Sequence, residues 1–223
     1  MCERPLVLCL TNSVAANFTA NCLLAVGARP AMVEEPVEAE ELAAVADALL
    51  VNVGTVHERQ AEAMRRAARV AVASGKPWVL DPVGVQFLPY RRAIVRELIG
   101  LKPSLIRGNR DEIAFLGETG VTTLATGETD FVSVPSPSSE QADNPNNRTI
   151  PGGVPLLQAV TATGCAQGGI CAALLGRGLS PSAAVVAASK LMKRAGELAW
   201  EKAQVPGSFQ VALVDALWRL THD

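Results

Sequence analysis

The segment PWVLDPVG, residues 77–84, joins a short apolar run to an acidic side chain and a tight turn. A helical pattern follows at 90–99. Such a short apolar run, without polar alternation, is typical of a strand buried on both faces of a sheet. A buried strand followed at once by a helix is the repeating unit of mostly parallel α/β folds.

Three other runs have the same form: PLVLCL before a helical pattern at 14–26, ALLVNVG before 56–74, and SLIRGN before 110–116. Two strand-like runs come next, at 122–126 and 131–134, and helices are expected at 166–175, 181 to about 201, and 209–220. The pattern predicts an α/β fold with a mostly parallel sheet, formed as one domain over residues 1–223. Residues 135–153 are rich in Pro, Ser and Asn, so we expect a flexible loop there.

Composition excludes several classes of function. The net charge of -2 provides no basic field for nucleic acid, and no apolar run approaches the roughly 18 residues of a membrane helix. The chain has only 2 histidines, too few for a histidine-based triad or a histidine metal cluster. Its 5 cysteines show no CxxC spacing, which favours a reducing, cytoplasmic location.

Polar groups end several of the predicted strands, where open α/β sheets bind ligands. Asp81 closes one strand, and the turn at 107–109 closes another. Glu112 follows Asn109 at capping-box spacing, so a capped helix is one interpretation and a hydrated Mg²⁺ held by Glu112 and Asp81 is another. Asp81 could equally be a simple cap at the strand end.

The turn TATGCAQGGI, residues 161–170, leads straight into an apolar helix. A helix beginning near Gly164 would point unpaired N–H groups and the positive end of its dipole at any anion above the turn. The alternative is that Thr163 is an ordinary N-cap and the glycines serve packing.

Together these motifs resemble the hydroxyethylthiazole kinase family, within the ribokinase-like group. The resemblance covers nearly the whole chain and rests on these segments, in family order: LTNSVAANFTANCLLAVGARPAMV, ALLVNVGT, PWVLDPVGV, YRR, KPSLIRGNRDEI, TGETD, TATGCA and PGSF. It implies a three-layer ribokinase-like fold. It also implies phosphorylation of the hydroxyethyl group of 4-methyl-5-(2-hydroxyethyl)thiazole by ATP with Mg²⁺, for thiamine salvage, by a homotrimer.

The resemblance also implies roles for individual residues. Met32 would contact the thiazole alcohol, Arg107 and Thr126 would contact ATP, and Asn109 with Glu112 would organise Mg²⁺ and phosphate, with Asp81 as a further magnesium-linked carboxylate. The family's anion hole corresponds to Ala162, Thr163, Gly164 and Cys165, with Ala162 beside the substrate. A thiol at a helix N-terminus has a lowered pKa, so one role for Cys165 is to accept the proton of the alcohol, and the alternative is to position the substrate.

The chain departs from the family pattern in two places. It starts almost at the first strand, without the helix that usually precedes it, and a segment with a crossover helix is missing after Leu116. These departures leave two alternatives open. One is a kinase acting on a hydroxymethylpyrimidine or pyridoxal-type alcohol, and the other is a non-catalytic nucleotide-binding remnant of the family.

Overall fold

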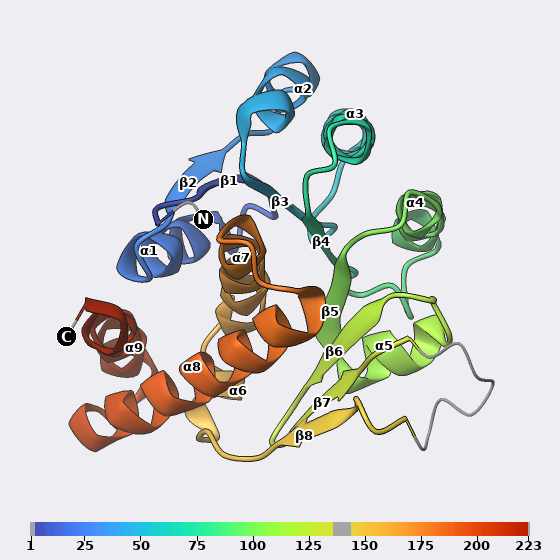
Figure 1. Ribbon diagram of the computed structural model, residues 1–223. Helices are drawn as coiled ribbons and strands as arrows, with labels where there is room; N and C mark the ends of the chain where they lie inside the picture. The colour runs from blue at the N-terminus through green and yellow to red at the C-terminus, as the bar shows by residue number, and fades with distance from the viewer. Residues whose placement is uncertain (1–2, 136–143, 223) are drawn as a thin grey trace.

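The computed structural model describes residues 3–135 and 144–222. In this part of the chain an eight-stranded sheet lies between two layers of helices (Figure 1). The strands are β1 (Leu6–Leu10), β2 (Arg29–Met32), β3 (Ala48–Asn52), β4 (Trp78–Asp81), β5 (Leu105–Asn109), β6 (Thr122–Thr126), β7 (Asp130–Ser133) and β8 (Arg148–Ile150). The helices are α1 (Ala16–Ala25), α2 (Pro36–Val45), α3 (Glu58–Ala73), α4 (Pro89–Gly100), α5 (Arg110–Leu116), α6 (Leu156–Ala159), α7 (Thr163–Gly176), α8 (Pro181–Lys202) and α9 (Pro206–His222).

The strand order is β2-β1-β3-β4-β5-β6-β7-β8. Strands β1 to β6 are parallel, and β7 and β8 continue the sheet as an antiparallel meander. The parallel strands therefore end at one edge, and each of β1, β3, β4 and β5 carries its following turn there. The predicted mostly parallel α/β fold is confirmed.

Alternate residues of each central strand point into different cores. On β3, Ala48 and Leu50 pack under α1, α7, α8 and α9, whereas Leu49 and Val51 pack under α2, α3 and α4. A parallel sheet covered on both faces needs apolar residues at successive positions. This is why the central strands read as uninterrupted apolar runs.

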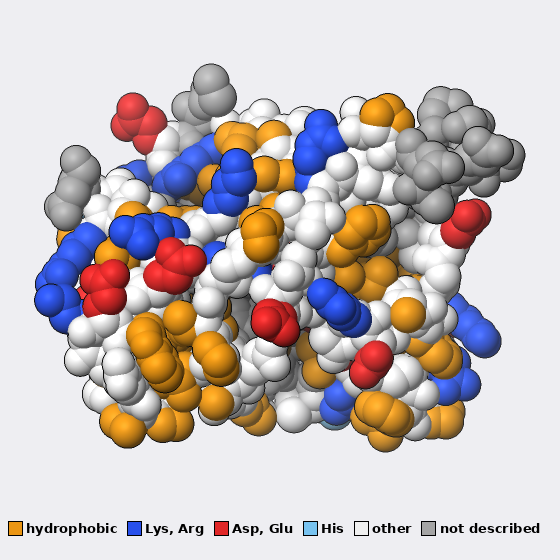
Figure 2. All heavy atoms as spheres, turned by 90° about the horizontal axis from the view of Figure 1, so that it is seen from below, with side chains coloured by type: hydrophobic (Ala, Val, Ile, Leu, Met, Phe, Trp, Pro, Cys, Tyr) orange, Lys and Arg blue, Asp and Glu red, His pale blue; other side chains and the backbone are white. Residues whose placement is uncertain are grey.

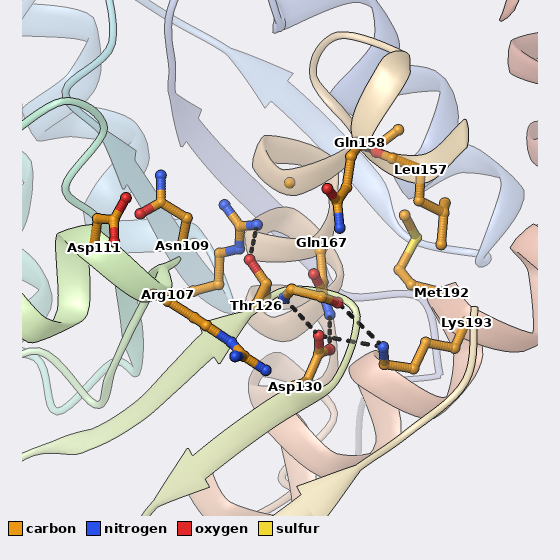
Figure 3. A pocket seen from close by; sticks show the side chains of 14 residues that line it. Arg107, Asn109, Asp111, Thr126, Asp130, Leu157, Gln158, Gln167, Met192 and Lys193 are labelled. Carbon is orange, nitrogen blue, oxygen red and sulfur yellow. Dashed lines mark hydrogen bonds and ion pairs between the residues drawn. The ribbon is translucent and has the colours of Figure 1, made fainter. Parts of the chain in front are cut away.

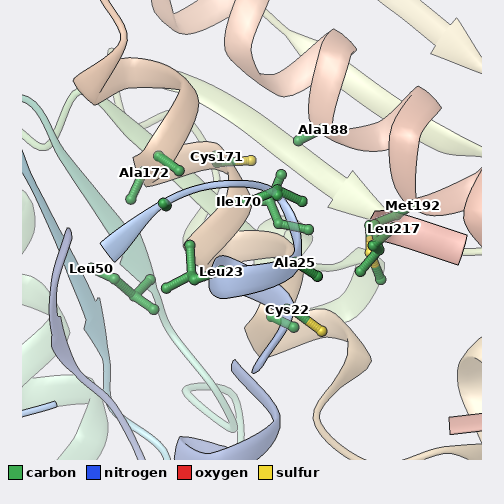
Figure 4. Packing of buried hydrophobic residues seen from close by; sticks show 14 of the residues in the cluster. Cys22, Leu23, Ala25, Leu50, Ile170, Cys171, Ala172, Ala188, Met192 and Leu217 are labelled. Carbon is green, nitrogen blue, oxygen red and sulfur yellow. The ribbon is translucent and has the colours of Figure 1, made fainter. Parts of the chain in front are cut away.

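Helix α7 lies across the middle of one face, in contact with β1, β3 and β4 and with α1 and α8. Figure 4 shows Ile170 and Cys171 of α7 among side chains from these neighbours. A Cβ on Gly169 would lie 3.1 Å from the Thr19 methyl group of α1, and a Cβ on Gly168 would lie 3.3 Å from Leu50. The two glycines thus permit the close approach of α7 to the sheet and to α1.

The crossover from β5 to β6 consists of α5 alone, a helix of 7 residues. Ile113 and Leu116 of α5 pack against the core formed by α2, α3 and α4, but the buried members of that core come from no strand beyond β5. On β7, Phe131 is 43% exposed while its neighbour Val132, which faces the other core, is fully buried. Thr123 and Ala125 of β6 are still buried, so this face of the sheet is thinly covered from β7 onward.

Some elements were not predicted. The sequence pattern gave no element for β2, α2, β8 or α6. The flexible loop expected at 135–153 is wrong in its last part, because Arg148–Ile150 forms β8 and pairs with β7. Residues 136–143 of that loop lie outside the described residues.

No helix among the described residues is long and apolar enough to cross a bilayer. On the face shown in Figure 2, the Lys and Arg side chains of the described residues are interspersed with acidic and apolar ones. This mixture agrees with the near-neutral charge of the whole chain.

The packing of α7 can be tested by substituting glycines. Gly169→Leu should lower the free energy of unfolding by about 1–3 kcal/mol, because the new side chain collides with Thr19 and Leu23. Gly100→Ala, at a position with no atom within 4 Å of the added Cβ, should raise it by up to about 1 kcal/mol. Urea unfolding measures both, and equal effects of the two variants would show that α7 is not packed as described.

Candidate functional site

A cavity of about 610 Å³ opens at the edge where β5 and β6 end (Figure 3). Its walls come from the turns after these strands, from the first turn of α7, and from the middle of α8. It is lined by Arg107, Asn109, Arg110, Asp111, Thr126, Gly127, Asp130, Leu157, Gln158, Thr163, Gly164, Gln167, Met192 and Lys193. Five of the residues predicted from the sequence therefore meet in one cavity, namely Arg107, Asn109, Thr126, Thr163 and Gly164.

Arg107 is the central cation of the site. It is 7% exposed, and its guanidinium donates to the Thr126 hydroxyl at 2.6 Å and lies 3.6 Å from the Asp81 carboxylate. The Thr126 hydroxyl in turn donates to the carbonyl of Gly108 at 3.1 Å. Arg107 is thus held from two sides, which fixes the direction of its remaining donors.

The first turn of α7 faces this guanidinium. A Cβ on Gly164 would lie 2.7 Å from Cζ of Arg107, so only glycine allows the approach. No side chain caps the helix, and Thr163 donates its hydroxyl to the carbonyls of Leu157 and Val160. The interpretation of Thr163 as an ordinary N-cap is therefore wrong. The helix presents uncapped N–H groups beside a guanidinium, an arrangement that binds anions.

Ala162, at the start of this turn, has a φ of 70° and a ψ of -2°. This is the left-handed region, which costs a residue with a Cβ about 1–2 kcal/mol. The strained alanine lies at the position where the resemblance places a substrate-contacting residue.

Asp81 is completely buried behind Arg107. Asn52 donates to its Oδ2 at 2.8 Å, whereas Oδ1 has no hydrogen-bond partner. Burial raises the pKa of Asp81 to about 6, although the nearby charge of Arg107 acts in the opposite direction. The carboxylate is therefore ionised at neutral pH and has an oxygen free to interact with a cation.

Glu112 and Asn109 form a complete capping box at the start of α5. The Glu112 carboxylate accepts from the backbone N–H of Gly84 and from that of Asn109, both at 2.8 Å. The capped-helix interpretation is confirmed. Each Glu112 oxygen already has one partner, so it could reach a metal ion only with its remaining lone pairs or through water.

The described residues contain no cluster of three or more His, Cys, Asp and Glu side chains that could enclose a metal ion. The free Oδ1 of Asp81 and the remaining lone pairs of Glu112 suit an ion that takes most of its ligands from water and phosphate. Mg²⁺ is such an ion. Asp81 and Glu112 are both buried and do not line the cavity, so magnesium held by them stays a prediction.

Cys165 lies in the first turn of α7 but is not an activated thiol. Burial raises its pKa to about 11, so the lowered pKa expected from the helix N-terminus is wrong. The Asn12 side chain donates to its sulfur at 3.5 Å and to the side-chain Oδ1 of Asn52 at 2.8 Å. Cys165 is thereby linked to Asp81 through two amide side chains.

Met32 lies apart from these residues. It ends the edge strand β2, is 37% exposed, and does not line the cavity. Sequence reasoning gave Asn12 no individual role and missed Asn52, although Asn52 is a polar residue within an apolar strand and could have signalled the site. It also missed Asp130 and Lys193.

Comparison with known proteins now identifies the family. The profile described as "HK: Hydroxyethylthiazole kinase family" matches residues 2–123 and 116–223. The chain is 41% identical over 251 aligned residues to hydroxyethylthiazole kinase of Escherichia coli (strain 55989 / EAEC), covering 99% of this chain and 91% of the relative. The chain belongs to the hydroxyethylthiazole kinase family.

Solved structures agree with this assignment. The hydroxyethylthiazole kinase protein from Pyrococcus horikoshii OT3 has a TM-score of 0.89 and 35% identity, covering 97% of this chain and 88% of that one. A putative ribokinase II from E. coli, described in complex with ATP and Mg²⁺, has a TM-score of 0.57 at 14% identity, covering 95% and 82%. The second comparison shows the ribokinase-like fold alone.

The internal deletion expected after Leu116 is supported by the same comparisons. The alignment with the E. coli thiazole kinase runs over 251 residues, more than the 223 of this chain, so the relative has residues that are missing here. The family profile matches in two parts that overlap at 116–123. The overlap begins at Leu116, the last residue of α5, which forms the short crossover.

Ala162→Gly should stabilise the fold by about 0.5–1 kcal/mol, because glycine adopts a positive φ without the cost of a Cβ. Lys102→Gly is the matched control, since Lys102 also has a positive φ, of 53°, and does not line the cavity. Both should raise the melting temperature, and only Ala162→Gly should alter turnover or substrate KM. If both variants altered turnover, the effect of Ala162→Gly could not be assigned to its position in the site, and the prediction would be wrong.

The Cys165 thiol should react slowly with iodoacetamide at pH 7.5. A pKa of about 11 leaves a thiolate fraction about a hundredfold below that of an ordinary thiol. Between pH 7 and 10 the rate should rise about tenfold per pH unit without a plateau. Peptide mapping by mass spectrometry measures the rate at Cys165 alone, and a plateau near pH 7 would contradict the buried neutral thiol.

Proposed function

We propose that this protein transfers the γ-phosphoryl group of ATP to the primary hydroxyl of 4-methyl-5-(2-hydroxyethyl)thiazole, the reaction of thiamine salvage. The observation that carries the proposal is the uncapped N-terminus of α7 packed directly against Arg107. Family membership supports the acceptor, since relatives are named hydroxyethylthiazole kinase.

Phosphoryl transfer requires alignment and neutralisation of charge more than covalent help from the protein. The backbone N–H groups at the start of α7 lie beside the donors of Arg107. Charge that develops on the phosphoryl oxygens there would be stabilised by donors that need not reorient. Thr126 and Asp81 contribute by holding Arg107 in place.

Magnesium, when bound, would neutralise the phosphate oxygens and align them for attack. Asp81 and Glu112 are the residues that would hold it, mostly through water. The ribokinase-like neighbour described in complex with ATP and Mg²⁺ supports the choice of this nucleotide and ion.

The acceptor alcohol would approach the phosphoryl site from the side of Ala162 and Cys165. With its pKa raised to about 11, Cys165 is a neutral thiol at physiological pH. It would therefore position the hydroxyl rather than remove its proton. The proton could leave with the phosphate product, since a loose transition state needs little base assistance.

Met32 would complete the thiazole site from a neighbouring subunit. Its side chain is partly exposed on the edge strand and does not line the cavity of its own chain. This supports the homotrimer that the family resemblance implies. The free thiols of Cys9, Cys22, Cys165 and Cys171 support a cytoplasmic location.

A coupled assay of ADP release tests the function. With ATP and Mg²⁺, the thiazole alcohol should be turned over at a kcat/KM at least about a hundredfold above that of hydroxymethylpyrimidine or pyridoxal. Faster turnover of the pyrimidine or pyridoxal alcohol would instead assign the protein to another ribokinase-like kinase. Nucleotide binding without turnover of any alcohol would identify a non-catalytic remnant.

A further inference from the structure

A buried ion pair lies behind the nucleotide end of the cavity, and the proposed mechanism does not use it. We propose that Lys193 and Asp130 are positioning residues for the nucleotide: they fix the turn at 127–129, and with it the hydroxyl of Thr126 that holds Arg107. This inference rests on the proposed function, because it assigns the cavity to ATP.

Lys193 lies on α8 and holds two other segments of the chain together through hydrogen bonds. Its Nζ donates to the carbonyl of Glu128 at 2.9 Å and to that of Gly152 at 2.8 Å. The carbonyl of Gly127 lies at 3.4 Å, and the Asp130 carboxylate also lies at 3.4 Å. Lys193 therefore binds the turn between β6 and β7 to the segment that follows β8.

Asp130 connects the same turn to two helices. One carboxylate oxygen accepts from the backbone N–H of Gly127 at 3.1 Å. The other accepts from the hydroxyl of Ser189 on α8 at 2.8 Å and lies 3.4 Å from the side-chain amide of Gln167 on α7. Figure 3 shows the contacts of Gln167 and Lys193 converging on Asp130 beside the cavity. The turn, α7 and α8 thus share one charged centre.

The geometry distinguishes positioning from direct phosphate binding. An ammonium group has three protons, and four acceptors already surround that of Lys193. The side chains of Lys193 and Asp130 are only 7% and 4% exposed. Lys193 has no free donor to offer a phosphate, so its influence on the nucleotide must pass through the turn that it holds.

The turn adjoins the nucleotide contacts directly. Gly127 follows Thr126, whose hydroxyl accepts from Arg107 at 2.6 Å. Release of the turn would leave the Thr126 hydroxyl held by the carbonyl of Gly108 alone, and the contact through which it fixes Arg107 would loosen. The acceptor alcohol is expected on the other side of Arg107, near Cys165, and should be less affected.

The test is Lys193→Met, which keeps the length of the side chain and removes its donors. The KM for ATP should rise about tenfold or more, while kcat and the KM for the thiazole alcohol stay within about threefold of the wild type. Titration calorimetry with ADP and Mg²⁺ should show the same loss of affinity without any phosphoryl transfer.

Arg177→Met is the matched control. Arg177 also donates to backbone carbonyls, those of Val26 and Glu3, but beyond the opposite end of α7. Its loss should lower the melting temperature and leave the KM for ATP unchanged. An equal rise in the KM for ATP in both variants would reduce the role of Lys193 to general stability and overturn the inference.

Lys193→Met leaves the buried carboxylate of Asp130 without its cation, and the double variant Lys193→Met, Asp130→Asn removes that charge. Removal of this buried carboxylate should restore much of the stability lost by Lys193→Met. It should not restore nucleotide affinity, because the carbonyls of Gly127 and Glu128 still lack their donor. Recovery of wild-type ADP affinity in the double variant would overturn the inference.

The wild-type protein separates this inference from the proposed function. Absence of ADP binding by the wild type would overturn both. Wild-type binding and turnover, together with an unchanged ADP affinity in Lys193→Met, would overturn the positioning role and leave the proposed function standing.

Discussion

The contact between the Arg107 guanidinium and the first turn of α7 is the constraint on which the site depends. Arg107 comes from β5, and the turn is reached only after the rest of the sheet has been completed. Their approach requires glycine at 164 and a left-handed backbone at 162. An uncapped helix N-terminus and a guanidinium both carry positive charge, so they repel each other unless an anion lies between them. This arrangement therefore favours the binding of an anion such as phosphate.

Two features of the fold bring Arg107 and the first turn of α7 together. The parallel sheet brings the turns after β3, β4 and β5 to one edge, so that Asn52, Asp81 and Arg107 form a continuous hydrogen-bonded and ionic chain. Helix α7 is brought close by the two glycines that face α1 and β3. The thin cover beyond β6 lies on the opposite face of the sheet. The shortened crossover can therefore coexist with an intact phosphate site.

The sequence was most informative where local pattern and tertiary environment agree. Buried parallel strands give apolar runs, so β1, β3, β4 and β5 could be predicted, as could the helices that follow them. Strand β2 could not, because it is an edge strand of four residues with exposed Arg29 and a proline. Helix α2 buries only small residues such as Ala39 and Ala43, which gives little apolar periodicity. Strand β8 has three residues within a polar stretch.

Some residues of the site could be found from local sequence patterns, whereas others depend on contacts that form only in the folded chain. The motifs around Arg107, Asn109 and Gly164 could be found because their spacing reflects turns and helix starts. The pKa of Cys165 could not, because burial raises it and burial is visible only in three dimensions. Lys193 reads in sequence as one more lysine on a long helix, and its carbonyl partners are about 41 to 66 positions away.

The most direct test of the account is a crystal structure with ADP, Mg²⁺ and a planar metal fluoride in place of the transferred phosphoryl group. We expect the fluoride at the N-terminus of α7, about 2.7–3.1 Å from backbone N–H groups of its first turn and from the Arg107 guanidinium. A fluoride bound elsewhere, with the N-terminus of α7 and Arg107 contacting only water, would contradict it.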